Sequence, residues 1–351
     1  MKNKVVGPSK DQWQELYRLA GEIKRLEPWT WMSEQNLFGV QNPKTGEIGY
    51  CSIMGALGEM YAIAVYLGPE GLIGWRKLSS GDVDIDHPDA MHIQKCLMLS
   101  FEDRDFIEKE DFKTIKLLGL KFRGRNAWPQ FRSYQPGYVP WYLAREEASV
   151  LVTALTQALN VIKRFKENNS LLIPPDKKSI FVRIPMKGSA AEEWTDAWMP
   201  PPPADRNDLL TFQPDEIRIR RVKKNSQRQR GGWEMDYFYF PVPIDEGERP
   251  YFPTVFVIVD HSRGLVLQNW LGRQSELYSD FQEIILGILE QLKVYPEEIL
   301  VGKPEAFQLL GQITSGLGTE LRLVEELECV ENLREEMNLQ FWGDPDDEFD
   351  E

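Results

Sequence analysis

The chain contains few of the residues from which catalytic and metal sites are most often built. Among its 351 residues are three histidines and three cysteines. Cys51, Cys96 and Cys329 are far apart and form no C-x-x-C pair, so neither a disulfide framework nor a thiolate zinc site is indicated. We interpret them as small core residues. A Walker loop, a dinucleotide fingerprint and a G-x-S-x-G motif are also absent, and we predict no cofactor.

Long hydrophobic runs and a positive net charge are missing as well. The first residues contain no apolar signal segment, and no run approaches the roughly 18 apolar residues that span a membrane. We therefore expect a cytoplasmic protein with no membrane partner. The 41 Lys and Arg against 55 Asp and Glu leave a net charge of −14. Because a field of that sign opposes general attraction to nucleic acid, any such binding has to be local.

The residues that are present predict a two-domain globular protein. Hydrophobic residues make up 42% and charged residues 27% of the chain, which is typical of packed proteins, and the length favours about two domains. We predict an α+β protein with an N-terminal domain over 1–173 and a C-terminal domain over 174–343. The latter comprises a loop-rich β segment, 174–250, and an α/β core, 251–343. The acidic residues 344–351 form a solvated tail.

The N-terminal domain is predicted to be an antiparallel sheet with covering helices. Ser9 and Gln12 can form a capping box for a helix over 10–26, where apolar residues recur at helical spacing. Strands are expected on both sides of a turn at 42–46 and in the apolar run 60–68, followed by a turn at 68–71 and a helix over 144–166 that covers one face of the sheet.

The C-terminal domain shows a more regular alternation. The runs 216–222 and 233–240 predict a hairpin around a basic Gly-Gly loop. The elements that follow have the order β-β-α-β-α-β-α, which predicts a parallel or mixed sheet. The strands are expected over 254–260, 265–270, 298–301 and 320–324, and the helices over 275–292, from Pro304 and near 328–338.

This element order resembles a reduced ribonuclease H-like fold, whose nucleases hold two divalent metals with carboxylates. The resemblance implies that Asp260 is the ligand of the first strand. At about 100° per residue, however, Glu276, Glu283 and Glu290 fall opposite the apolar face of their helix. Lys303 stands where this family needs an acid. Two-metal chemistry requires a converging set of carboxylates, and two of the expected ones are missing.

A turn provides another interpretation of Asp260. In both 42–46 and 260–264, Asn or Asp comes first and Gly follows four residues later, between apolar strands. Asx side chains accept hydrogen bonds from backbone N–H groups just downstream, and a Gly with positive φ suits the exit of such a turn. We therefore favour a structural Asp260 over a metal ligand.

The segment 81–92 is a second candidate for metal binding. Its potential ligands are Asp82, Asp84, Asp86, His87 and His92. It departs from a calcium-binding EF-hand loop, because His87 stands where Gly is needed and Ile93 where a bidentate Glu belongs. An adventitious site through His87 and His92 and a plain acidic surface loop are the two alternatives.

Two basic segments are candidates for binding single-stranded nucleic acid. The first, residues 121–132, interleaves cations with aromatic residues, and the second is the basic loop from 218 to 230. The candidate residues are Lys121, Arg123, Arg125, Trp128, Arg132, Arg218, Arg220, Arg221, Lys223 and Lys224. Cations for phosphate and aromatic faces for stacking are the groups that such binding uses. The alternative is that the aromatic residues belong to the core and the cations are solvated or stacked on them.

The N-terminal residues also resemble an uncharacterised bacterial family with a second, C-terminal domain of unknown function, similar to residues 250–340. The resemblance is carried by Trp13, Leu16-Tyr17, Pro28-Trp29-Thr30-Trp31, Leu37-Phe38-Gly39-Val40, Tyr50 to Gly55, Gly58-Glu59 and Val65 to Gly68. It implies no substrate and no catalytic residue.

Taken with the missing catalytic motifs, the sequence predicts a non-catalytic binding or interaction protein with an unknown protein or nucleic-acid partner. The alternatives are a nucleic-acid-binding protein that uses the basic segments and a divalent-metal nuclease or hydrolase at Asp260.

Overall fold

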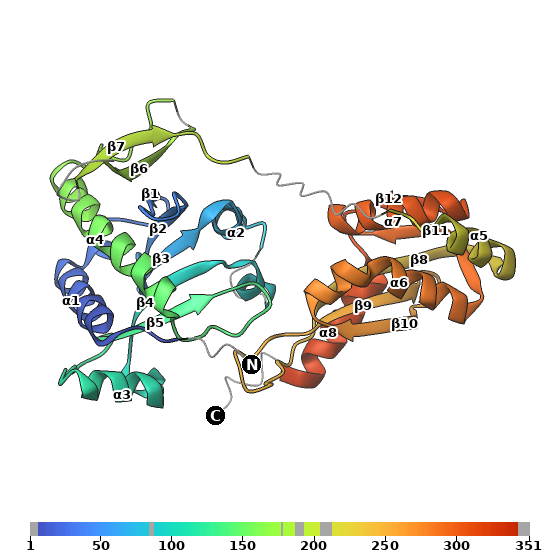
Figure 1. The fold of residues 1–351 in the computed structure, drawn as a ribbon, viewed down its shortest axis with the longest axis horizontal. Coiled ribbons are helices and arrows are strands. Elements are labelled where there is room, and N and C mark those ends of the chain that lie inside the picture. The colour runs from blue at the N-terminus through green and yellow to red at the C-terminus, as the bar shows by residue number, and fades with distance from the viewer. Residues whose placement is uncertain (1–5, 84–87, 177, 187–192, 204–212, 343–351) are drawn as a thin grey trace. The chain divides into compact units, whose positions relative to one another are not determined.

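The chain folds into two compact units, Met1–Ala204 and Asp205–Glu351 (Figure 1). The computed structural model describes residues 6–83, 88–176, 178–186, 193–203 and 213–342, so the acidic tail lies outside the described residues. The α+β class is confirmed in both units. The boundary falls later than the predicted position near residue 173.

The first unit is built on a seven-stranded sheet in the order β5-β4-β3-β2-β1-β6-β7. The strands are β1 (Phe38–Gln41), β2 (Ile48–Met54), β3 (Tyr61–Leu67), β4 (Cys96–Glu102), β5 (Trp128–Tyr134), β6 (Ile180–Pro185) and β7 (Trp194–Met199). The sheet is mixed, because β6 pairs parallel to β1 while the other neighbours pair antiparallel. Residues 174–204, predicted to belong to the second domain, therefore contribute two strands to the first sheet.

Helices cover both faces of this sheet. They are α1 (Lys10–Leu26), α2 (Gly68–Ser80), α3 (Lys109–Leu117) and α4 (Arg145–Glu167). The predicted capping box is confirmed, since Gln12 N donates to Ser9 Oγ and Ser9 N donates to Gln12 Oε1. α1 and α4 pack on the face that includes Ile63 and Val65, and α2 packs on the face of Ala64 and Tyr66.

The predicted turn at 68–71 is wrong, because these residues begin α2. Gly68 has a φ of +62°, which ends β3 with a sharp change of direction. Pro69 then lies in the first helical turn, where its fixed φ and missing N–H fit the helix start. Gly68 and Pro69, which indicated a turn, thus mark the end of a strand and the start of a helix.

The second unit contains a five-stranded mixed sheet in the order β10-β9-β8-β11-β12. Its elements are α5 (Glu216–Asn225), β8 (Gln227–Tyr239), β9 (Thr254–Asp260), β10 (Leu265–Gly272), α6 (Gln274–Leu292), β11 (Val294–Val301), α7 (Pro304–Leu317), β12 (Glu320–Leu323) and α8 (Glu328–Trp342). The predicted order from β9 to α8 is confirmed. It is preceded by β8, which pairs antiparallel to β9 and parallel to β11 and so lies at the centre of the sheet.

The predicted hairpin over 216–240 is wrong, because residues 216–225 form the helix α5. Asp215 caps it by accepting a hydrogen bond from Arg218 N. Ile219 and Val222 are buried three residues apart, whereas Ile217 is 73% exposed. A strand would place Ile217 and Ile219 on one face, but a helix separates them.

Two helical layers also cover the second sheet. α5, α6 and α7 contribute to the core on one face, and α8 packs on the other. Along β8, Trp233, Met235 and Tyr237 point into the first of these layers. Glu234 and Asp236 alternate with them, so two acids lie on the α8 face of a central strand.

None of the helices in the described parts of the chain combines the length and apolar character that a membrane crossing requires.

Candidate functional site

Asp260 lies at the end of β9 and is held by its own turn. Its Oδ1 accepts from Ser262 N at 3.0 Å, Ser262 Oγ at 2.7 Å and Arg263 N at 3.1 Å. These hydrogen bonds, led by the one from the Ser262 side chain, lower the pKa of Asp260. Asn42 makes the corresponding contact, accepting from Lys44 N at 2.9 Å. The turn-forming role favoured from the sequence is confirmed.

The ribonuclease H resemblance implied that Asp260 is the metal ligand of the first strand, but the strand β8 precedes it. Asp260 ends the second strand of the unit, and the first strand, β8, carries Asp236. Lys303 Nζ lies 2.9 and 2.8 Å from the two carboxylate oxygens of Asp236. On α6, Glu283 and Glu290 bind Arg218 of α5. Asp236 is therefore neutralised by Lys303, and Glu283 and Glu290 are neutralised by Arg218.

The acidic segment 81–92 is only partly described. Asp84, Asp86 and His87 lie outside the described residues, Asp82 is exposed and His92 is buried. The proposed pairing of His87 with His92 stays a prediction.

The segment 121–132 contributes its aromatic residues to the core. Trp128 packs edge-on against Phe112 and Phe122. The Arg132 guanidinium is buried and forms a bidentate ion pair with Asp111, at 3.0 and 2.7 Å. Among the candidate cations of this segment, Lys121, Arg123 and Arg125 remain exposed.

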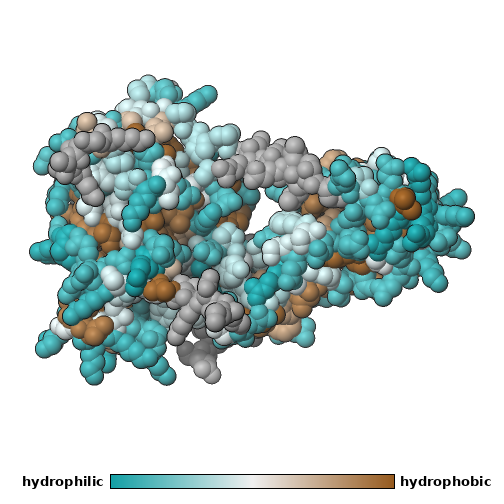
Figure 2. Space-filling model, in the orientation of Figure 1, coloured by the Kyte–Doolittle hydropathy of each residue, from teal (hydrophilic) through white to brown (hydrophobic). Residues whose placement is uncertain are grey.

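The basic residues of 218–224 lie on α5, in the other unit. Arg218 is clamped by Glu283 and Glu290, with the guanidinium 2.6 to 2.9 Å from their oxygens. Arg220, Arg221, Lys223 and Lys224 are exposed, and Figure 2 shows mainly hydrophilic side chains over the region of α5. The cations needed for nucleic-acid binding are therefore present on α5, but the stacking rings of 121–132 are packed inside the other unit.

An open pocket of about 710 Å³ lies in the first unit. It is formed by the end of α1, the segment that follows it, the β2–β3 connection and the loop near residue 125. Its lining combines three aromatic residues, two cations, one carboxylate and several amide or hydroxyl groups. The main residues are Lys24, Glu27, Trp29, Trp31, Tyr61 and Arg125.

Lys24 places its cation against aromatic rings at this pocket. Nζ lies 5.0 Å from the ring centroid of Trp29, 5.1 Å from that of Tyr61 and 5.4 Å from that of Phe101. Such cation–π contacts favour the charged amine. Burial nevertheless lowers the pKa of Lys24, and the nearby charge of Glu27 opposes that shift. The pocket thus presents a partly desolvated amine beside aromatic faces.

Gly55 shapes the β2–β3 connection beside Trp29. Its φ is +128°, which L side chains rarely adopt. A Cβ at this position would meet Tyr61 Cδ1 at 2.7 Å and the Met60 carbonyl oxygen at 2.8 Å. Because a side chain would force backbone and ring apart, Gly55 permits the close approach that forms this wall of the pocket.

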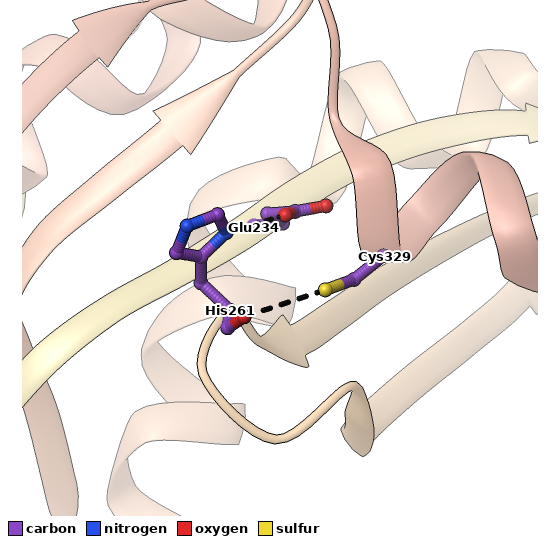
Figure 3. Close-up of side chains that lie close together, drawn as sticks. All are labelled: Glu234, His261 and Cys329. Atoms are coloured by element: carbon purple, nitrogen blue, oxygen red, sulfur yellow. Dashed lines mark hydrogen bonds and ion pairs between the residues drawn. The ribbon is translucent and has the colours of Figure 1, made fainter.

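A second constellation lies on the α8 face of the second unit (Figure 3). Glu234 comes from β8, His261 from the β9–β10 turn and Cys329 from the first turn of α8. His261 Nδ1 lies 2.6 Å from Glu234 Oε1, and Val330 N donates to Glu234 Oε2 at 3.0 Å. Glu234 is fully buried, whereas the His261 side chain is 48% exposed. A buried carboxylate, an imidazole and a thiol therefore meet at one place.

Sequence reasoning missed both the pocket and this cluster. The cluster joins residues 234, 261 and 329, which no local motif connects. One signal in the sequence could have indicated Glu234. The acids Glu234 and Asp236 alternate with Trp233, Met235 and Tyr237. In a strand covered on both faces, such acids must be buried and need partners. The interpretation of 233–240 as a strand of a hairpin did not include that requirement.

The fold is that of a two-domain α+β protein. Comparisons with known families also divide the chain into two domains. Residues 13–183 match a domain of unknown function, DUF7309, and residues 218–338 match a second domain of unknown function, DUF6930. The chain matches no curated protein. The pocket residues lie within the first match and the cluster residues within the second. The bacterial character of the family suggested by the sequence stays a prediction.

Proposed function

We propose that the protein is a non-catalytic binding protein and that the pocket of its first unit takes a small organic anion with an aromatic or apolar part. The observation that carries the proposal is the Lys24 amine, which lies against the rings of Trp29 and Tyr61 in the lining of an open pocket of about 710 Å³. Pockets of this size, with aromatic walls and a few polar groups, are typical of small-molecule sites.

The composition of the pocket supports an anionic ligand with a flat or apolar group. Lys24 and Arg125 supply positive charge, and the Arg125 side chain is 91% exposed. Trp31 and Tyr61 are partly exposed and supply surface for stacking or apolar contact. Asn36 and Asn126 add groups that can donate hydrogen bonds and fix orientation. Glu27 disfavours a second negative charge nearby, which favours ligands with one anionic group.

The second unit supports a non-catalytic role as well. Its element order resembles the ribonuclease H-like fold, but of the two acids on the central strand Asp236 is paired with Lys303 and Glu234 lies against His261. Glu283 and Glu290 are engaged by Arg218. A two-metal nuclease needs these positions to converge as free carboxylates. We infer that this unit serves as a binding scaffold.

The experiment compares matched charged and neutral probes. The full chain, labelled with 5-fluorotryptophan, is titrated with indole-3-acetate against indole-3-acetamide and with benzoate against benzamide. We expect the anion of each pair to shift the Trp29 or Trp31 resonance and to raise Tm. At ten times Kd the stabilisation is about 1.4 kcal/mol. Lys24→Gln should weaken binding about tenfold, since one charge-assisted contact is lost.

Lys163→Gln is the matched control, because Lys163 is an exposed lysine on α4 that pairs with Glu22 away from the pocket lining. It should bind the probes as the parent does. Equal binding of the anion and its neutral partner, or equal binding by Lys24→Gln and the parent, would contradict the proposal.

A further inference from the structure

Glu234, His261 and Cys329 present three different metal-binding atoms to one another. One ligand atom from each residue lies within 4.8 Å of those of the other two. The residues come from β8, the turn after β9 and the start of α8, so the fold itself brings them together. We propose that they bind a divalent transition-metal ion of intermediate softness, of the Zn²⁺ type.

The donor set defines the class of ion. Ca²⁺ and Mg²⁺ select oxygen ligands, so an imidazole and a thiolate argue against both. A site with one nitrogen, one sulfur and one oxygen donor suits Zn²⁺ and its chemical neighbours. Three protein ligands leave a position for a fourth, and the half-exposed His261 makes the cluster accessible to solvent.

Glu234 is fixed as a ligand before any ion arrives. Its side chain is fully buried on the central strand, and Oε2 accepts from Val330 N at 3.0 Å. This leaves Oε1 directed at His261, 2.6 Å away. A hydrogen bond that orients a ligating carboxylate is a regular part of metal sites. The backbone of His261 is held too, since its N donates to the Gly232 carbonyl oxygen at 3.1 Å.

The spacing requires small adjustments of the imidazole and of the thiol, which donates a hydrogen bond to the His261 carbonyl oxygen at 3.4 Å. Ligands at about 2.0 to 2.3 Å around a tetrahedral ion lie roughly 3.3 to 3.7 Å apart. The imidazole, now 2.6 Å from Glu234 Oε1, therefore has to move outward by about 1 Å. Its 48% exposure leaves it room to do so, while Glu234 stays in place.

Negative charge around the thiol favours a cation. Burial, followed by the charges of Glu234, Glu328 and Asp260, raises the pKa of Cys329. When an ion binds, a metal–sulfur bond forms, the thiol proton leaves to solvent and no group changes oxidation state.

The test uses the full chain, freed of metal with EDTA and titrated with Co²⁺ and then Zn²⁺. We expect one ion per chain, a thiolate-to-Co²⁺ charge-transfer band in the near ultraviolet, and loss of the band when Zn²⁺ displaces Co²⁺. His261→Asn and Cys329→Ser should each weaken Zn²⁺ binding by about 100-fold or more, since each removes a direct ligand. Cys329→Ser should also abolish the band.

His87→Gln provides the control, because it alters the other sequence candidate for metal binding. It should leave affinity and spectrum unchanged. Any one of three results would overturn the proposal: no thiolate band in the parent, parent-like affinity in both site variants, or loss of binding in His87→Gln. Glu234→Gln can also unfold the start of α8, so the decision rests on His261 and Cys329, which are not fully buried.

Discussion

Asp260 contributes to stability through the three hydrogen bonds that its Oδ1 accepts within its own turn. Asp260→Asn keeps an acceptor oxygen but loses the negative charge, so at neutral pH it should destabilise the fold by less than Asp260→Ala does. Asp260→Ala removes the acceptor and should cost roughly 1 kcal/mol. Asn42→Ala at the twin turn is the matched control and should cost a similar amount. Urea denaturation measures all three, and an Asp260→Ala variant as stable as the parent would contradict the assignment.

The same carboxylate predicts a pH dependence. The pKa of Asp260 is lower in the folded chain than in the unfolded chain, chiefly because of the Ser262 hydroxyl. The ionised group therefore stabilises the fold above the usual Asp pKa, and this contribution is lost as pH falls through the lowered folded-state pKa. Asp260→Asn cannot titrate, so the difference in stability between parent and variant should shrink over that acidic range.

At the scale of elements, the burial of two isoleucines at the start of α5 distinguishes a helix from the predicted strand. Ile219 is 2% exposed and Ile217 is 73% exposed. Ile219→Ala should cost about 2 to 4 kcal/mol, because it leaves a cavity in the core. Ile217→Ala should stay within about 0.5 kcal/mol of the parent. If the segment were a strand, both side chains would share one face. Comparable losses of unfolding free energy in the two variants would therefore support the strand.

The elements that the sequence predicts well are those whose local signals agree. α1 has a capping box as well as apolar residues at helical spacing, and the helix over 145–167 has six turns of such spacing. α5 has ten residues and only two buried apolar ones, so its pattern also fits an alternating strand. α2 was missed because Gly68 and Pro69 indicate a turn as strongly as a helix start.

The candidate sites depend on contacts that local patterns do not contain. The turn role of Asp260 was predictable because its partners lie within four residues. Lys24 meets Tyr61 and Phe101 only after the sheet has formed. Glu234 and Cys329 are separated by 95 positions of sequence and meet only when α8 packs on β8. Pairings over such distances follow from topology, which periodicity alone does not determine.

At the scale of the whole molecule, the position of the boundary decides which fragment can fold. In β6, Phe181 and Val182 are buried, and Val182 pairs with Gly39 of β1. A fragment of residues 1–204 keeps these contacts, whereas one of residues 1–173 exposes the edge of β1 and opens the core. Burial of one Phe and one Val side chain contributes roughly 3 to 6 kcal/mol.

We therefore expect fragment 1–204 to unfold in one cooperative urea transition and to stay monomeric. Fragment 1–173 should be less stable by several kcal/mol and should aggregate, because an unpaired strand edge templates association. Fragment 1–204 with Val182→Asp is an intermediate control that keeps the chain length but disrupts the β1–β6 contact. Equal unfolding free energies for the two fragments would show that β6 and β7 are an addition to an already complete domain.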